Sequence, residues 1–181
     1  MKSSFVSQRW FVVSAAVAWC VLAGATAFAQ PKEKALRVGV YDSRAIAVAW
    51  FNSAEFRKSL DAVTADYKKA KEAKDDKRVK EIEAKMKLQQ RRQHEQGFST
   101  GSVASTMARI KDSLPAVAKK LGVDLIVSKW EVNYQSPDVK VVDVTDDLVA
   151  LFHASEKGLE WAKGIRSQQP LPIEQITDDM D

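Results

Sequence analysis

Few side chains in this sequence have the type and spacing that catalysis or metal binding requires. The histidines, His94 and His153, stand far apart and form no H-x-x-x-H or similar zinc-binding spacing. The residues GFSTG at 97–101 fit the G-x-S-x-G pattern, but the segment before them has helical and not strand periodicity, so the strand–turn–helix context of a nucleophile elbow is absent. The sequence contains no phosphate-binding loop. We interpret both histidines as surface residues, and we predict neither a bound metal nor another cofactor.

Two groups of carboxylates are the remaining candidates for acid–base chemistry. Asp42-Ser43-Arg44 follows a predicted strand, where α/β enzymes often place functional groups, but a helix cap is the simpler interpretation. Asp146 and Asp147 are adjacent at a predicted helix start, where carboxylates meet the positive end of the helix dipole. We therefore expect no enzymatic activity, and an enzyme of this sequence would use the Asp42 corner.

Charge is distributed unevenly along the chain. Residues 57–95 carry 13 basic and 8 acidic side chains, whereas residues 138–181 carry 4 basic and 10 acidic ones. A basic middle suits anionic or mixed-charge partners. Because 8 acids interrupt the 13 bases, the segment does not favour nucleic acid. Solvated helix faces are the alternative interpretation of these charges.

The N-terminal residues have the organisation of a secretory signal. Lys2 and Arg9 precede an apolar run over 10–25, and Ala27-Phe28-Ala29 follows it. The run is shorter than the roughly 20 apolar residues of a membrane-spanning helix. We expect residues 1–29 to be a signal peptide that is cleaved after Ala29, which places the mature protein in the periplasm.

Cysteine chemistry is absent from the predicted mature chain. The single cysteine, Cys20, lies within the signal, and the bulky Trp19 before it does not fit a lipoprotein processing site. Disulfides, thiolate metal sites and cysteine nucleophiles are therefore excluded from residues 30–181.

Apolar periodicity predicts short strands at both ends of the mature chain and helices between them. Leu36, Val38 and Val40 alternate with other residues, and strand-like runs recur at 123–130 and 139–144. Asp112 or Ser113, with Pro115, begins a helix that ends at Gly122. Thr145 caps a short helix, and an amphipathic helix over 155–167 follows it.

A heptad seam marks the middle of the chain. Its first group of apolar residues is spaced 4, 3, 4 and 3 positions apart: Phe56, Leu60, Val63, Tyr67 and Ala70. After an interruption at 74–77 the seam resumes with Val79, Ile82 and Met86. Two hairpins fit: a turn at Asp75-Asp76, or one long helix to Gln96 with a turn at Gly97. We favour the first, because it brings the two apolar seams side by side.

These elements predict an α+β fold of one domain over 30–181. Residues 35–51 and 122–153 form a small β-sheet body, in which strands distant in sequence pair. Residues 52–121 form a projecting antiparallel α-helical, coiled-coil hairpin of two arms. Residues 154–181 form a C-terminal helix and an acidic tail.

The C-terminal half of this plan resembles the Skp-like (OmpH-type) periplasmic chaperones. The similarity lies in a strand, a turn and a strand–helix junction that the family also carries, which here read GVDLIV at 122–127, VNYQSPDV at 132–139 and DVTDDLV at 143–149. The signal, the first strand and the charged helices follow the family's order. The arms are shorter than in well-known members, and the segment after Phe152 has no counterpart in the family.

The resemblance implies a homotrimer whose helical hairpins hold unfolded outer-membrane or envelope proteins without ATP. Anionic lipid head groups are a further expected partner. The residues expected to contact clients are basic or adaptable apolar ones: Lys68, Lys69, Lys71, Lys77, Arg78, Lys80, Lys85, Met86, Lys87, Arg91, Arg92 and Phe98. The alternative is a non-catalytic envelope scaffold module with one dedicated partner, recognised by the Trp161 helix and the acidic tail.

Overall fold

The computed structural model describes residues 35–177 and has the predicted mixed α+β character. The expected signal peptide, with Cys20, lies outside the described residues. None of the helices in the described range combines the length and the apolar composition that crossing a bilayer requires.

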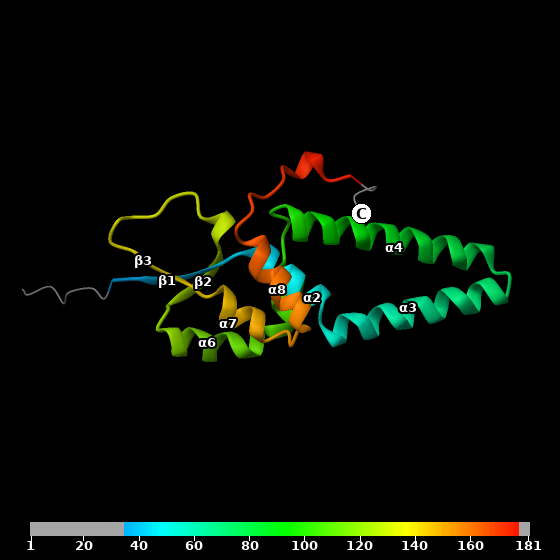
Figure 1. Cartoon of the computed structure of the whole chain (residues 1–181), viewed down its shortest axis with the longest axis horizontal. Helices are drawn as coiled ribbons and strands as arrows, with labels where there is room; N and C mark the ends of the chain where they lie inside the picture. Colours follow the sequence, from blue (N-terminus) through cyan, green and yellow to red (C-terminus); the bar gives the residue numbers. More distant parts are fainter. Residues whose placement is uncertain (1–34, 178–181) are drawn as a thin grey trace, which may run out of the picture. The chain divides into compact units, whose positions relative to one another are not determined.

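A three-stranded parallel sheet pairs the first strand of the described chain with two strands from beyond residue 124 (Figure 1). Strand β1 (Arg37–Tyr41) lies between β2 (Leu125–Ser128) and β3 (Lys140–Asp143). Val38 is in register with Leu125 on one side and with Val141 on the other. The predicted pairing of distant strands is therefore confirmed. Neighbouring parallel strands need crossover connections, so the chain between β1 and β2 leaves the sheet and returns to the end of the sheet at which β1 begins.

Helices fill the connections and cover one face of the sheet. In chain order the helical elements are α2 (Ser43–Phe51), α3 (Ala54–Glu72), α4 (Asp76–Phe98), α5 (Ala104–Met107), η1 (Ala108–Ser113), α6 (Leu114–Leu121), η2 (Lys129–Glu131), α7 (Thr145–Ala150), α8 (Glu156–Ile165) and η3 (Ile173–Gln175). The predicted C-terminal helix is present and starts after Ser155, whose hydroxyl accepts a hydrogen bond from the Gly158 backbone. The predicted cap at Thr145 is wrong: Thr145 is the first residue of α7, and its hydroxyl accepts a hydrogen bond from the Asp42 backbone. Gly122 ends α6 in the left-handed conformation expected of a glycine cap.

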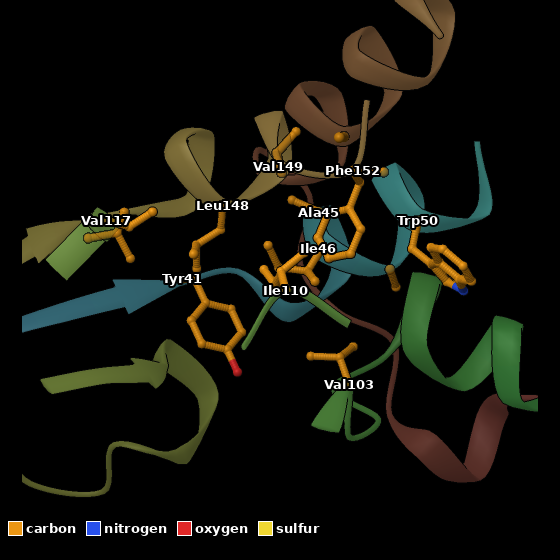
Figure 2. Close-up of a cluster of buried hydrophobic side chains, with 14 of the residues drawn as sticks. Tyr41, Ala45, Ile46, Trp50, Val103, Ile110, Val117, Leu148, Val149 and Phe152 are labelled. Atoms are coloured by element: carbon orange, nitrogen blue, oxygen red, sulfur yellow. The ribbon is translucent and has the colours of Figure 1, made fainter. Parts of the chain in front are cut away.

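The main core lies between the sheet and helix α2 (Figure 2). Ala45, Ile46 and Leu148 are fully buried in it, and the rings of Trp50 and Phe152 meet edge to face at 6.3 Å between centroids. Helix α8 packs on α2 so closely that a Cβ atom on Gly158 would lie 2.4 Å from the Asn52 Cβ. The apolar run at Ala45–Phe51 therefore serves as the centre of the core.

The segment after α4 differs from its predicted place in the arms. Val103, Ile110 and Val117 are buried in the main core, so residues 103–121 pack with the body. The prediction that the arms extend over all of 52–121 is therefore wrong for residues 103–121. The helical spacing at Val103 and Ile110 is compatible with a place in an arm or in a core. Their packing against the other residues of the main core places them in the body.

The turn between the two long helices lies where we favoured it. Helix α3 ends at Glu72 and α4 begins at Asp76, with Asp75 as its N-cap. In Figure 1 the two helices run side by side and join at the end away from the sheet. The projecting antiparallel coiled-coil hairpin predicted from the heptad seam is not shown.

Candidate functional site

Side-chain caps fix the start of α3 and of α4. The Ser53 hydroxyl accepts a hydrogen bond from the Phe56 backbone N–H at 3.1 Å, and Asp75 accepts one from the Arg78 N–H at 2.9 Å. Lys74 takes a positive φ of 55°, which lets the chain reverse within three residues. Each cap satisfies backbone donors that the first turn of a helix leaves unpaired.

A small apolar cluster holds α3 and α4 together next to their connection. This tip cluster consists of Ala70, Val79 and Ile82, which are buried, with Val63 and Tyr67 packed against them. Two polar links flank it: the Tyr67 hydroxyl donates to Glu83 at 2.9 Å, and Arg78 pairs with Asp66 at 2.5 Å. Because Arg78 and Asp66 are both partly exposed, water screens their ion pair, and apolar packing provides most of the attachment.

Between the tip cluster and the body, α3 and α4 enclose a groove of about 630 Å³. Leu60 and Val63 continue the apolar seam of α3, but the facing positions of α4 carry Gln90 and Gln93. A seam without an apolar partner cannot close, so Leu60 stays 38% exposed and Met86 44% exposed. The α3–α4 groove is lined by Leu60, Val63, Thr64, Tyr67, Glu83, Met86, Lys87, Gln89, Gln90 and Gln93.

The predicted client-contacting residues all lie on α3 or α4. Nine of them are exposed basic residues spread over both helices: Lys68, Lys69, Lys71, Lys77, Lys80, Lys85, Lys87, Arg91 and Arg92. Arg78 is instead half-buried between Asp66 and Glu81. Hydrogen bonds and charges from Asp66, with a smaller contribution from Glu81, raise the pKa of Arg78.

The structure brings two of these residues into the groove and keeps a third apart. Met86 and Lys87 line the groove. Phe98 ends α4, about 18 Å along the helix from Met86, where its ring faces His94 at 5.7 Å between centroids and its carbonyl accepts a hydrogen bond from Leu171. The other groove residues are not among the predicted client contacts. The mainly polar sequence of α4 after Met86 could have indicated them, because it leaves the apolar seam of α3 without an apolar partner.

The Asp42 corner forms a buried charged cluster at the carboxyl ends of the strands. Asp42 follows β1 and is 1% exposed, and its carboxylate caps α2 by accepting a 3.0 Å hydrogen bond from the Arg44 backbone. It also pairs with the Arg44 guanidinium at 2.9 Å and with Lys129, which follows β2, at 2.8 Å. The Asp42 backbone donates to the Thr145 hydroxyl after β3 at 3.1 Å. Asp42 therefore serves as the N-cap of α2, which is the interpretation that we favoured from the sequence.

Electrostatics keep this carboxyl ionised. Burial alone raises the pKa of Asp42, but hydrogen bonds and charges from Arg44 and Lys129 outweigh it and hold the pKa at about 2. Trp130 completes the cluster, with the Arg44 guanidinium 5.0 Å and the Lys129 amine 4.3 Å from its ring centroid. These contacts join the ends of three strands into one unit, which we interpret as a structural role.

The two acids at the start of α7 also have cationic partners. Asp146 pairs with Arg166 at 2.6 Å, and Asp147 pairs with Lys120 at 2.7 Å. Their place in the first turn of α7 agrees with the helix-dipole interpretation. His153 is exposed just after α7, and His94 is partly buried on α4.

The second face of the sheet is apolar and partly open. Side chains on the first face, such as Tyr41 and Ile126, enter the main core, whereas their neighbours point the other way. Leu125 is 51% exposed and Val141 41% exposed on this side. The open sheet face consists of Leu36, Val38, Val40, Leu125, Val127 and Val141, and together with the 131–139 segment it borders a hollow of about 310 Å³. We did not predict this face, although β2 and β3 carry apolar residues at consecutive positions.

Comparison of the chain with protein-family models, with curated proteins and with solved structures found no significant match. The function must therefore be argued from the residues and their geometry.

Proposed function

We propose that the protein is a periplasmic holding chaperone, which binds unfolded outer-membrane or other envelope proteins without ATP and without catalysis. The observation that carries this proposal is the α3–α4 pair, whose exposed basic residues surround a groove with exposed apolar side chains. A holder must bind an unfolded chain at many weak points, because tight binding at one point would prevent release. Many modest contacts over two helices provide such avidity.

The shape that we propose for α3 and α4 is an antiparallel hairpin of the coiled-coil type that projects from the sheet body as an arm. The tip cluster and the short connection at 73–75 support this part of the proposal. The basic residues of the arm would meet acidic client segments or anionic lipid head groups. The resemblance to the Skp-like (OmpH-type) chaperones adds a family in which such arms are known.

We further propose that copies of the chain associate through the open sheet face, as a trimer by resemblance to that family. Parallel sheets are normally covered on both faces, and here residues 35–177 leave one apolar face partly exposed. An apolar surface of this kind gains free energy when a second protein surface removes it from water.

The direct test is dilution of a denatured outer-membrane porin into buffer with and without the purified protein. We expect a several-fold molar excess of the protein to suppress light scattering by the porin, with or without ATP. Undiminished scattering at that excess contradicts the proposal. An unrelated basic protein of similar size controls for nonspecific charge.

The second candidate is a non-catalytic envelope scaffold module with one dedicated partner. It is favoured by α8, where Leu159 and Trp161 expose apolar surface. The porin dilution separates the two candidates, because a scaffold would leave the aggregation of an unrelated unfolded protein unchanged.

A further inference from the structure

We propose that the α3–α4 groove binds an extended, strand-like peptide segment in which every second side chain is apolar. This inference rests on the proposed holding function and adds where the client lies and which conformation it takes. It assigns the gripping contact to the groove instead of to the basic outer surfaces of the two helices.

The groove is pinned open at both of its ends. The tip cluster joins α3 to α4 next to their connection. At the body, the Phe56 ring of α3 packs on Trp50 at 5.6 Å between centroids, and Leu171 donates a hydrogen bond to the carbonyl of Phe98 in α4 at 2.9 Å. Because both helices are held at two points, the stretch between them forms a groove without a ligand.

The apolar floor has a spacing that fits alternate residues of a strand. Leu60, Val63 and Tyr67 lie three and four residues apart, so they form one stripe on α3. Side chains one helical turn apart are separated by about 5–6 Å, and alternate side chains of a strand by about 6.6 Å. The stripe spans about 10 Å, which accommodates about three residues of an extended chain.

The opposite wall offers hydrogen bonds to an unpaired peptide backbone. Gln89, Gln90 and Gln93 line this wall on α4, and each side-chain amide both donates and accepts. An extended segment presents backbone N–H and C=O groups that need partners, whereas a helical segment has already paired its own. The wall therefore discriminates in favour of an extended occupant.

The charge of the lining also points to a peptide. Glu83 and Lys87 are the charged residues of the groove, they have opposite signs, and Glu83 accepts a hydrogen bond from Tyr67. Such a lining is complementary to a neutral ligand. Phosphate-bearing ligands instead require a local excess of cations.

The test uses a fluorescein-labelled peptide of about ten residues, in which Val, Ile or Tyr alternates with Thr or Ser. The reference peptide has the same composition and label with its apolar residues at helical spacing. We expect the full protein to bind the alternating peptide at least about fivefold more tightly in fluorescence anisotropy. The affinity should change less than about threefold between 50 and 500 mM NaCl, since the contacts are uncharged.

Two variants remove different walls of the groove. Leu60→Ser with Met86→Ser should weaken binding about tenfold, and alanine at Gln89, Gln90 and Gln93 should weaken it at least about threefold. Alanine is the best helix former, so the second variant keeps α4 intact. The matched control is Leu88→Ser with Leu159→Ser, which removes exposed apolar side chains outside the groove and should change affinity less than about twofold.

Several results would overturn the inference. Equal binding by the parent and by either groove variant shows that the groove is not the site, and equal or tighter binding of the reference peptide shows that the occupant is not extended. A lower sedimentation mass of the groove variants shows that a second copy of the chain fills the groove. If the parent also suppresses porin aggregation, the holding function stands and only the groove assignment fails; if it does not, the proposed function itself fails.

Discussion

Replacing Asp42 by Asn is expected to lower the free energy of unfolding by about 3–5 kcal/mol at pH 7, because it leaves a buried cation unpaired. Arg44 is fully buried, and the Asp42 carboxylate accepts three of its N–H groups. Asn keeps the size of the side chain and can still cap α2, so the loss reports the missing charge. Urea unfolding at a fixed protein concentration measures the difference.

Two further variants separate charge burial from general damage. Asp42→Asn combined with Arg44→Met should cost less than the sum of the single changes, since it removes both buried charges. Asp146→Asn breaks an ion pair with Arg166 in which Asp146 is 82% exposed, and it should cost less than about 1 kcal/mol. If Asp42→Asn costs no more than Asp146→Asn, the cluster does not hold the strand ends together.

The same cluster gives a signed dependence of stability on pH. The pKa of Asp42 is about 2 in the folded chain, below the ordinary value of 3.8. Because the pKa of this carboxyl is lower in the folded state, its ionisation stabilises the folded protein at pH values above 3.8. This contribution is lost as the pH falls through about 2. Between pH 4 and pH 2 the parent should therefore lose more stability than the Asp42→Asn variant.

Charges introduced on the open sheet face should abolish self-association. Leu125→Glu with Val141→Glu replaces one exposed apolar residue on each of the two edge strands, β2 and β3, so the folded monomer loses little packing. If copies meet on this face, each side chain contributes about 1.5–3 kcal/mol on burial, and losing both weakens association at least about 100-fold. Sedimentation equilibrium at micromolar concentration measures the change.

Helix α8 offers a matched surface for this experiment. Trp161→Glu places the same charge on an exposed apolar residue away from the sheet, and it should leave the sedimentation mass unchanged. Association that survives the double sheet-face variant would place the contact between copies elsewhere. Dissociation by Trp161→Glu alone would identify α8 as the contact.

Local signals in the sequence predicted much of the fold. Alternating residues in β1, the N-cap position at Asp42 and the glycine cap at Gly122 each act through neighbouring residues in the chain, so sequence suffices to find them. The predicted turn at Asp75-Asp76 followed from placing the two apolar seams side by side, and the connection observed at 73–75 lies within two residues of it.

Features that depend on distant partners were not predicted. Val103 and Ile110 have a spacing that suits an arm as well as a core, and only packing on the body decides between them. Lys129 and Asp42 follow two different strands, β2 and β1. The sequence does not predict the register in which these strands pair, so it does not predict this contact. The groove arises from what α4 lacks opposite Leu60, and such a mismatch appears only when two helices are aligned residue by residue.

The most direct test of the account removes the arm and keeps the body. Residues 57–95 are replaced by a Gly/Ser linker, which retains Phe56 in the core and the contact of Phe98 with Leu171. Circular dichroism and sedimentation first establish that the shortened chain is folded and assembled like the parent. The shortened protein should then leave the aggregation of the diluted porin unsuppressed at an excess at which the parent suppresses it, whereas equal suppression by both proteins would contradict a gripping role for α3 and α4.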